Sequence, residues 1–174
     1  MSVPATYYFA LGQKGKVLVG RTPVGVENPI GDVLRMATLV EFNNELKGLV
    51  VGRDGNSNED QLIAYSETMI RVRRLVPQVP WPRINPDGLP VDEASKWQAL
   101  ELPQEVKGKK ITGAAGSITG QILVMCDRKL WVYRPSTRQA DGRWTWEWQG
   151  NSRGELDFAF HDAIPGFALY SEYL

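Results

Sequence analysis

The residue types that most often carry catalysis are scarce in this 174-residue chain. His161 is the single histidine, and Cys126 is the single cysteine and lies in an apolar run typical of a buried strand. The chain therefore has no histidine cluster for zinc, and a reactive Cys–His pair is not expected. Carboxylates are plentiful, but their spacing in the sequence does not identify a catalytic pair. The sequence predicts a protein that is not an enzyme and that has no resident cofactor.

One loop begins like a calcium-binding loop. Oxygen-bearing side chains alternate at Asp54, Asn56, Asn58 and Asp60, and calcium prefers such oxygen ligands. The loop departs from the calcium pattern at Glu59, where a glycine is needed for the sharp turn. The corresponding loop of the internal repeat described below has no carboxylate. A solvated Asx-rich turn is therefore the favoured interpretation, and calcium binding is the alternative.

Tryptophans are the other candidate ligand-binding residues. Their flat faces can stack on sugar rings or anchor a protein interface. The candidates for contact with a sugar or a protein partner are Trp81, Trp131, Trp144, Trp148 and Arg143. In residues 143–148 tryptophan alternates with other residues, which predicts a strand with three tryptophans on one face. Such a face more often packs between sheets than binds a ligand.

Charge and hydropathy narrow the classes of partner. The chain has 20 basic and 20 acidic residues, so no net charge attracts nucleic acid or an anionic membrane. No apolar run approaches the roughly 18 residues that a membrane span needs, and no signal peptide is recognised. The sequence predicts a soluble protein without nucleic-acid or membrane partners. We expect it in the cytoplasm, or in a virus particle if its source is viral.

An internal repeat organises the middle of the chain. Displacing the sequence by 60 positions places 38–74 on 98–134, and the run 61–74 matches 121–134 without a gap. Apolar positions match as well, as at Ile63 and Leu123. The identical pairs are Glu41/Glu101, Glu45/Glu105, Lys47/Lys107, Gly48/Gly108, Ser57/Ser117, Gln61/Gln121, Val72/Val132 and Arg74/Arg134. The two segments are therefore expected to fold alike.

The ends of the chain carry a third, divided copy. A β-rich hairpin is predicted around Gly12 and Gly15, and the tail resembles the beginning of a repeat that stops before its hairpin. We therefore expect one all-β domain over 1–174. Its parts are repeat 1 at about 38–74, repeat 2 at about 98–148, repeat 3 split between 156–174 and 5–36, and a proline-rich strap at 77–90.

The repeat unit resembles a generic β-propeller blade. It has four predicted strands in about sixty residues, and the runs 62–66 and 122–126 are mainly apolar without alternation, as in strands covered on both faces. The 54–60 loop likewise resembles the calcium loops of some propeller blades. The resemblance implies a propeller-like fold in which both termini share one blade. A β-trefoil, which also has three four-stranded repeats, is the alternative.

Three blades are too few for an ordinary closed propeller. The resemblance therefore implies that two chains build a six-bladed ring, or that the chain docks on other copies in a larger assembly. We expect a non-enzymatic structural or interaction module whose partners are copies of itself or other proteins, with a phage or virus tail or capsid as the first setting to consider. A carbohydrate-binding propeller or trefoil lectin, with a glycan as partner, is the alternative function.

Overall fold

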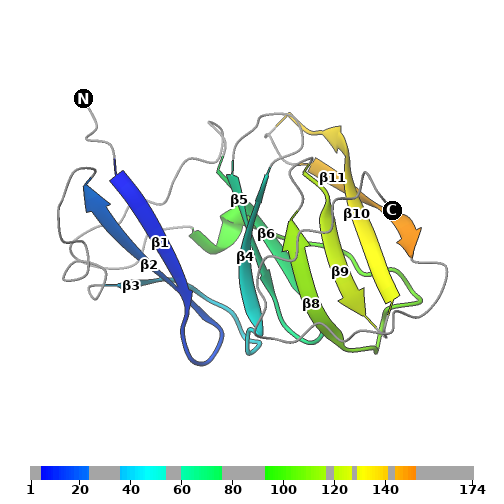
Figure 1. Cartoon of the computed structure of the whole chain (residues 1–174), viewed down its shortest axis with the longest axis horizontal. Helices are drawn as coiled ribbons and strands as arrows, with labels where there is room; N and C mark the ends of the chain where they lie inside the picture. Colours follow the sequence, from blue (N-terminus) through cyan, green and yellow to red (C-terminus); the bar gives the residue numbers. More distant parts are fainter. Residues whose placement is uncertain are drawn as a thin grey trace. The chain divides into compact units, whose positions relative to one another are not determined.

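The computed structural model describes residues 5–23, 36–53, 60–75, 93–116, 120–126, 129–140 and 144–151. These residues form eleven strands and one short 3-10 helix, η1 (Glu93–Lys96), and contain no α-helix (Figure 1). The strands lie in three antiparallel sheets, which confirms the all-β prediction. The proline-rich strap at 77–90 and the tail at 156–174 lie outside the described residues.

The chain divides into two compact units. The first unit contains residues 1–46 and 82–95, and the second contains 47–81 and 96–174. The first unit holds a three-stranded sheet in the order β1-β2-β3, with β1 (Ala5–Leu11), β2 (Lys16–Pro23) and β3 (Ala37–Glu41). The second unit holds the other eight strands.

The predicted N-terminal hairpin is confirmed as β1 and β2. Leu11 pairs with Val17, and the turn is closed by a hydrogen bond from the Gly12 amide to the Lys16 carbonyl (2.8 Å). Gly15 has a φ of 75°, and an added Cβ there would lie 2.3 Å from the carbonyl oxygen of Phe42. Glycine is therefore required by both the backbone conformation and the close approach of the chain after β3.

Strand β3 belongs to the N-terminal sheet. Val40 pairs with Val17, and Lys16 pairs with Glu41, whose carboxylate lies 3.7 Å from the Lys16 ammonium. The sequence comparison placed this segment at the beginning of repeat 1. In the structure it completes the preceding meander, because its hydrogen bonds go to β2.

Two sheets of the second unit have the same strand order. The first is β4 (Gly48–Arg53), β5 (Asp60–Tyr65), β6 (Ile70–Arg74) and β7 (Trp97–Ala99), and the second is β8 (Ile111–Gly116), β9 (Ile122–Cys126), β10 (Lys129–Arg138) and β11 (Trp144–Asn151). Each is a meander in which consecutive strands pair. Ile63 pairs with Val72 in one, and Leu123 pairs with Val132 in the other. The central hairpins therefore have the same register at the displacement of 60 residues that the sequence comparison gave.

The first strands of these sheets do not follow that displacement. Gly48 pairs with Tyr65 at the beginning of β4, whereas Gly113 pairs with Met125 near the beginning of β8. Gly108, which the sequence comparison aligned with Gly48, instead lies in the turn before β8 with a φ of 83°. The link before β8 contains this additional turn, and β8 consequently starts later than the identical residues suggest.

Gln98 and Ala99 lie in a different sheet from the strands within residues 111–148 of the predicted repeat 2. The sequence comparison placed Gln98 and Ala99 at the beginning of repeat 2. In the structure they pair with Val72 and Arg71 as part of β7, the outer strand of the first sheet.

A shared apolar core joins the two sheets of the second unit. Ile63 and Val72 from the sheet that begins with β4 belong to the same buried cluster as Val124 and Tyr133 from the sheet that begins with β8. All five residues of β9 are buried, which confirms the prediction of a strand covered on both faces. The other face of β9 packs with β8 and β10 residues in a smaller cluster of Ala115, Leu123, Met125 and Leu130.

Strands β4 and β8 come together at two glycines. A Cβ added to Gly116 would lie 2.4 Å from the Gly52 Cα, and one added to Gly52 would lie 2.9 Å from the Gly116 Cα. Real Cβ atoms do not approach backbone so closely, so neither position has room for a side chain. The two first strands are therefore in backbone contact, and the Ile63 side chain lies beside them.

Candidate functional site

The described part of the calcium-candidate loop is held by an ion pair. Asp54, Asn56 and Asn58 lie outside the described residues. Asp60 begins β5, pairs in register with Arg53, and has its carboxylate 3.4 Å from the Arg53 guanidinium. No group of three potential metal ligands occurs among the residues that the structure describes. Asp60 thus has a structural partner already.

We expect calcium to have no effect on this protein. Asp60 would have to exchange its contact with Arg53 for the metal, and Glu59 occupies the position of the required glycine. Calorimetric titration with calcium should give no binding heat, and the melting temperature should not change. A saturable heat accompanied by a higher melting temperature would instead identify the 54–60 loop as a calcium site.

The candidate tryptophans with described side chains belong to the core. Trp131 on β10 is 7% exposed, and Trp146 and Trp148 on β11 are half-buried against the main apolar cluster. The Trp131 and Trp148 rings meet edge to face, with centroids 5.7 Å apart. Aromatic pairs favour this geometry. Inter-sheet packing is therefore the role that the geometry supports for these rings.

A single backbone carbonyl accepts hydrogen bonds from two members of this aromatic cluster. The Trp148 indole N–H donates to the Glu101 carbonyl oxygen at 2.9 Å, and the Tyr133 hydroxyl donates to the same oxygen. Burial raises the pKa of the Tyr133 hydroxyl well above its ordinary value. Tyr133 is therefore neutral at any physiological pH and acts as a donor. These contacts fix the link after β7 against the second sheet.

The remaining candidate residues cannot be placed at a site. Trp81 and Arg143 lie outside the described residues, and the Trp144 side chain is not described. Cys126 is completely buried in the main core cluster, as the sequence predicted. His161 also lies outside the described residues.

The sequence did not predict that polar side chains of β5 and β6 would be buried. Gln61 and Arg73 are completely buried, and Arg74 is nearly so. The Gln61 amide donates to the Arg53 carbonyl (2.9 Å), and the Arg73 guanidinium donates to the Arg74 carbonyl (2.8 Å). Two consecutive arginines on a strand normally predict one exposed side chain, so the pattern gave no signal of their burial.

The second feature that was missed is a concentration of lysines at one end of the second unit. The exposed pair Glu67–Lys110 lies there, with 2.8 Å between carboxylate and ammonium. The hydrogen bond from Lys110 lowers the pKa of Glu67, and the charges of Lys110 and Lys47 act in the same direction. The run Lys107–Lys110 was visible in the sequence, but the additional lysines come from distant strands.

The pKa of Glu67 gives a direct test of this arrangement. Because its folded pKa is lowered, the contribution of Glu67 to stability is present above its ordinary pKa of 4.5 and is lost as the pH falls through the folded value. The pair is exposed and screened, so the effect on the melting temperature should be small. We expect an NMR titration to place the Glu67 carboxyl below its ordinary pKa, and Lys110→Ala to raise it. An unchanged pKa in Lys110→Ala would contradict the pairing.

No helix among the described segments is long and apolar enough to cross a membrane. Comparisons with protein families, with curated proteins and with solved structures give no match.

Proposed function

We propose that the protein is a non-enzymatic structural module of propeller-like design, which acts as a subunit of a homo-oligomeric assembly. The observation that carries this proposal is the pair of four-stranded meanders whose first strands touch at Gly52 and Gly116. Propeller blades are four-stranded meanders, and their first strands converge around the axis of the ring. A trefoil instead closes a barrel from its hairpins, and the described strands form three separate sheets.

The same design accounts for the N-terminal sheet. Its described part has three strands where the other two sheets have four. In our proposal the tail, residues 156–174, supplies the remaining strand, so that both termini share one blade. Its segments at 158–160 and 167–169 are apolar and contain three phenylalanines, a residue type enriched in strands, and Pro165 and Gly166 mark a turn between them. Each chain then contributes three blades.

An ordinary closed propeller needs more than three blades, so in our proposal two chains form a closed six-bladed ring. Closed symmetry limits the assembly to a fixed number of copies, whereas an open contact would continue to larger species. We place the assembly in a phage or virus particle, as a tail or capsid component, by analogy with other small β modules. Detection of the chain in purified particles by mass spectrometry tests this setting.

Chemical cross-linking of the purified full-length chain tests the closed assembly. An amine-reactive reagent should produce a species of two chains that saturates, without a ladder of larger products. A ladder would show an open assembly and would overturn the ring, and the absence of any cross-linked species at micromolar concentration would overturn oligomerisation itself.

The lectin alternative rests on the tryptophans. Trp131 is buried and Trp148 donates its indole N–H to Glu101, so neither presents a free flat face with an available donor. This favours the structural proposal. A glycan array tests the alternative directly, since saturable binding of one class of glycan would establish a lectin.

A further inference from the structure

Five lysines gather at one end of the second unit, and we call this surface the lysine end. It consists of Lys47, Lys107, Lys109, Lys110 and Lys129. Lys47 precedes β4, and its amide bonds to the Tyr65 carbonyl at the end of β5 (2.8 Å). Lys129 begins β10 and pairs with Cys126, which also pairs with Ile111 directly after Lys110. Strand ends that are distant in the sequence thus bring the five residues together.

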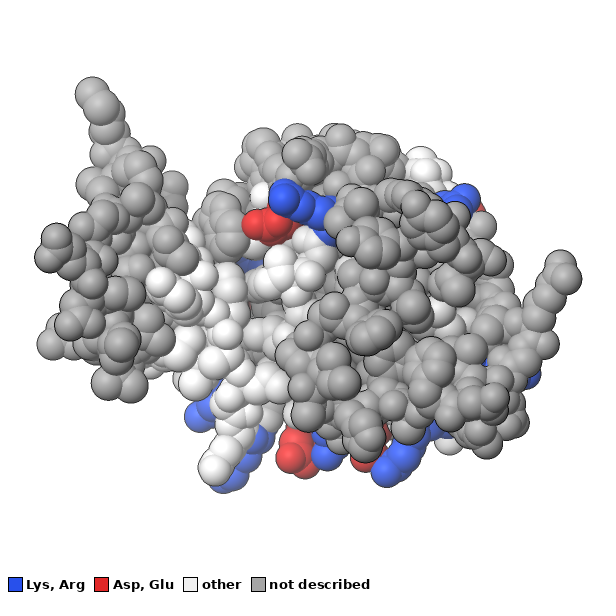
Figure 2. Space-filling view, in the orientation of Figure 1, with Lys and Arg blue, Asp and Glu red and all other residues white. Residues whose placement is uncertain are grey.

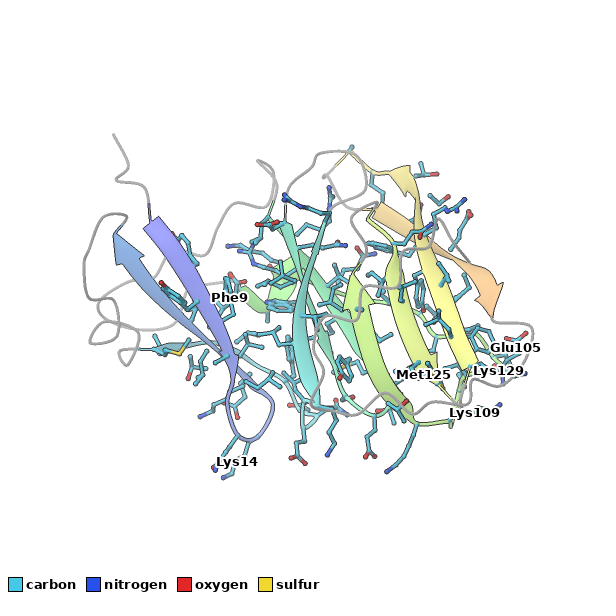
Figure 3. The ribbon with its side chains drawn as sticks, viewed as in Figure 1. Phe9, Lys14, Glu105, Lys109, Met125 and Lys129 are labelled. Atoms are coloured by element: carbon cyan, nitrogen blue, oxygen red, sulfur yellow. The ribbon has the colours of Figure 1, made fainter. Side chains whose placement is uncertain are left out.

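A compact turn presents three of these lysines. Val106 is completely buried, and the turn is closed by amides of Val106 and Lys107 that donate to the Pro103 carbonyl, at 3.0 and 3.2 Å. Gly108 adopts a φ of 83°, with no atom within 4 Å of an added Cβ. Lys107, Lys109 and Lys110 are all exposed. Figure 3 shows Lys109, Lys129 and Glu105 at the same end of the second sheet. Val106 therefore anchors the turn in the core, and the three lysine side chains are exposed to solvent.

The lysine end carries a net positive charge in a chain that is neutral overall. In the described turns that carry or adjoin these lysines, the acidic residues are Glu45, Glu67 and Glu105, against five lysines. Glu67 is engaged by Lys110, and its lowered pKa reflects the surrounding positive charge. Below the strands of the second unit, Figure 2 shows blue side chains beside red ones. Positive charge therefore exceeds what the local carboxylates neutralise.

The composition of the lysine end favours carboxylates over phosphates. Phosphate and nucleic-acid sites favour arginine, whose planar guanidinium binds two oxygens, and single strands also need aromatic faces for stacking. No arginine and no exposed aromatic ring lies among the described residues of the turns before β4 and β8 or between β5 and β6, and Asp127 and Arg128, between β9 and β10, lie outside the described residues. Arg71 on β6 is engaged with the Met69 sulfur at 3.0 Å. The interspersed glutamates would repel a continuous phosphate chain but suit a partner of mixed, mainly acidic charge.

We propose that the lysine end binds a carboxylate-rich surface of a protein partner. This inference rests on the proposed function, because it names a surface through which an assembly subunit would contact another protein. Lys107 and Lys109 form its centre. Lys110 makes a contact of this kind within the protein, because its ammonium group pairs with the Glu67 carboxylate.

Binding of a model acidic peptide tests the proposal. The probe is a fluorescein-labelled peptide of about ten glutamates, followed by fluorescence anisotropy with the full-length protein. The test variant is Lys107→Glu/Lys109→Glu. The control is Lys14→Glu/Arg134→Glu, which makes the same change in net charge at two exposed positions elsewhere. Circular dichroism of each variant verifies that the fold is retained.

We expect the test variant to bind the peptide about tenfold more weakly than the natural chain, and the control variant to lose less than about twofold. Binding of the natural chain should weaken as the salt concentration rises. Equal losses in both variants, no binding at low salt, or tighter binding of a thymidine oligonucleotide of equal charge would each overturn the proposal. Oligomeric mass is measured separately, so failure here does not depend on failure of the proposed ring.

Discussion

Gly116→Ala should destabilise the protein by about 3 kcal/mol, which would lower the melting temperature by about 6–12 °C. The added methyl group would lie 2.4 Å from the Gly52 Cα and 3.2 Å from the Ile63 Cδ1. The Ile63 side chain can move, but the Gly52 backbone is held in β4 by its pairing with Gln61. The two sheets would therefore have to separate. Thermal and urea denaturation measure the loss.

Gly108→Ala is the matched control for this prediction. It makes the same chemical change in the same unit, but no atom lies within 4 Å of the added Cβ. Its cost is limited to the strain of an alanine at a φ of 83°, about 1 kcal/mol. If both variants lost the same stability, close packing between β4 and β8 would not be what makes Gly116 necessary.

Trp131→Ala should cost about 4 kcal/mol, because a large buried side chain is removed from the main core cluster. Trp131→Phe should cost much less. It keeps an aromatic ring beside Trp148, and it removes a buried indole N–H that has no acceptor among the described residues. Urea denaturation of both variants provides the measurement.

A double-mutant cycle with Trp148→Ala completes this test. The edge-to-face contact predicts a coupling of about 1 kcal/mol between the two tryptophans. A sugar-binding role predicts the opposite pattern: Trp131→Ala would leave stability nearly unchanged and abolish glycan binding.

The strands could be predicted from local patterns, and their partners only in part. Alternation and apolar runs located β5, β6, β9 and β10. The register of the two central hairpins followed from the displacement of 60 residues, since identical residues at Gln61 and Gln121 mark the same place in both. Alternation and apolar runs involve residues that are close in the sequence, so they can be recognised in a single sequence.

The partners of the connecting segments could not be predicted in this way. The sequence of residues 37–41 fits a strand of the N-terminal sheet or of the sheet that begins with β4. Only the hydrogen bonds to β2 place these residues in the N-terminal sheet. Trp97–Ala99 similarly joins β6 after a long separation in the sequence. Lys47/Lys107 and Gly48/Gly108 are identical pairs, yet the additional turn around Gly108 moves the next strand out of register. Identical residues in the two segments therefore need not occupy equivalent positions, because strand pairing also depends on the length of the link before each strand.

The candidate site was predictable only as a set of residue types. The tryptophan alternation at 144–148 correctly indicated a strand, and the favoured packing role agrees with the burial of Trp131 and Trp148. The lysine end was not predicted, because balanced overall charge concealed a local excess that arises when Lys47, Lys110 and Lys129 converge. The burial of Arg73 and Arg74 was equally invisible, since arginine is rarely buried completely.

The mass of the purified chain in solution tests the proposed assembly most directly. Light scattering coupled to size-exclusion chromatography should give about twice the chain mass of 19.5 kDa, with the same value over a wide range of protein concentration. Such a value is what a ring closed by two three-bladed chains requires. A stable monomer of 19.5 kDa would contradict the account, because three blades alone cannot close a propeller.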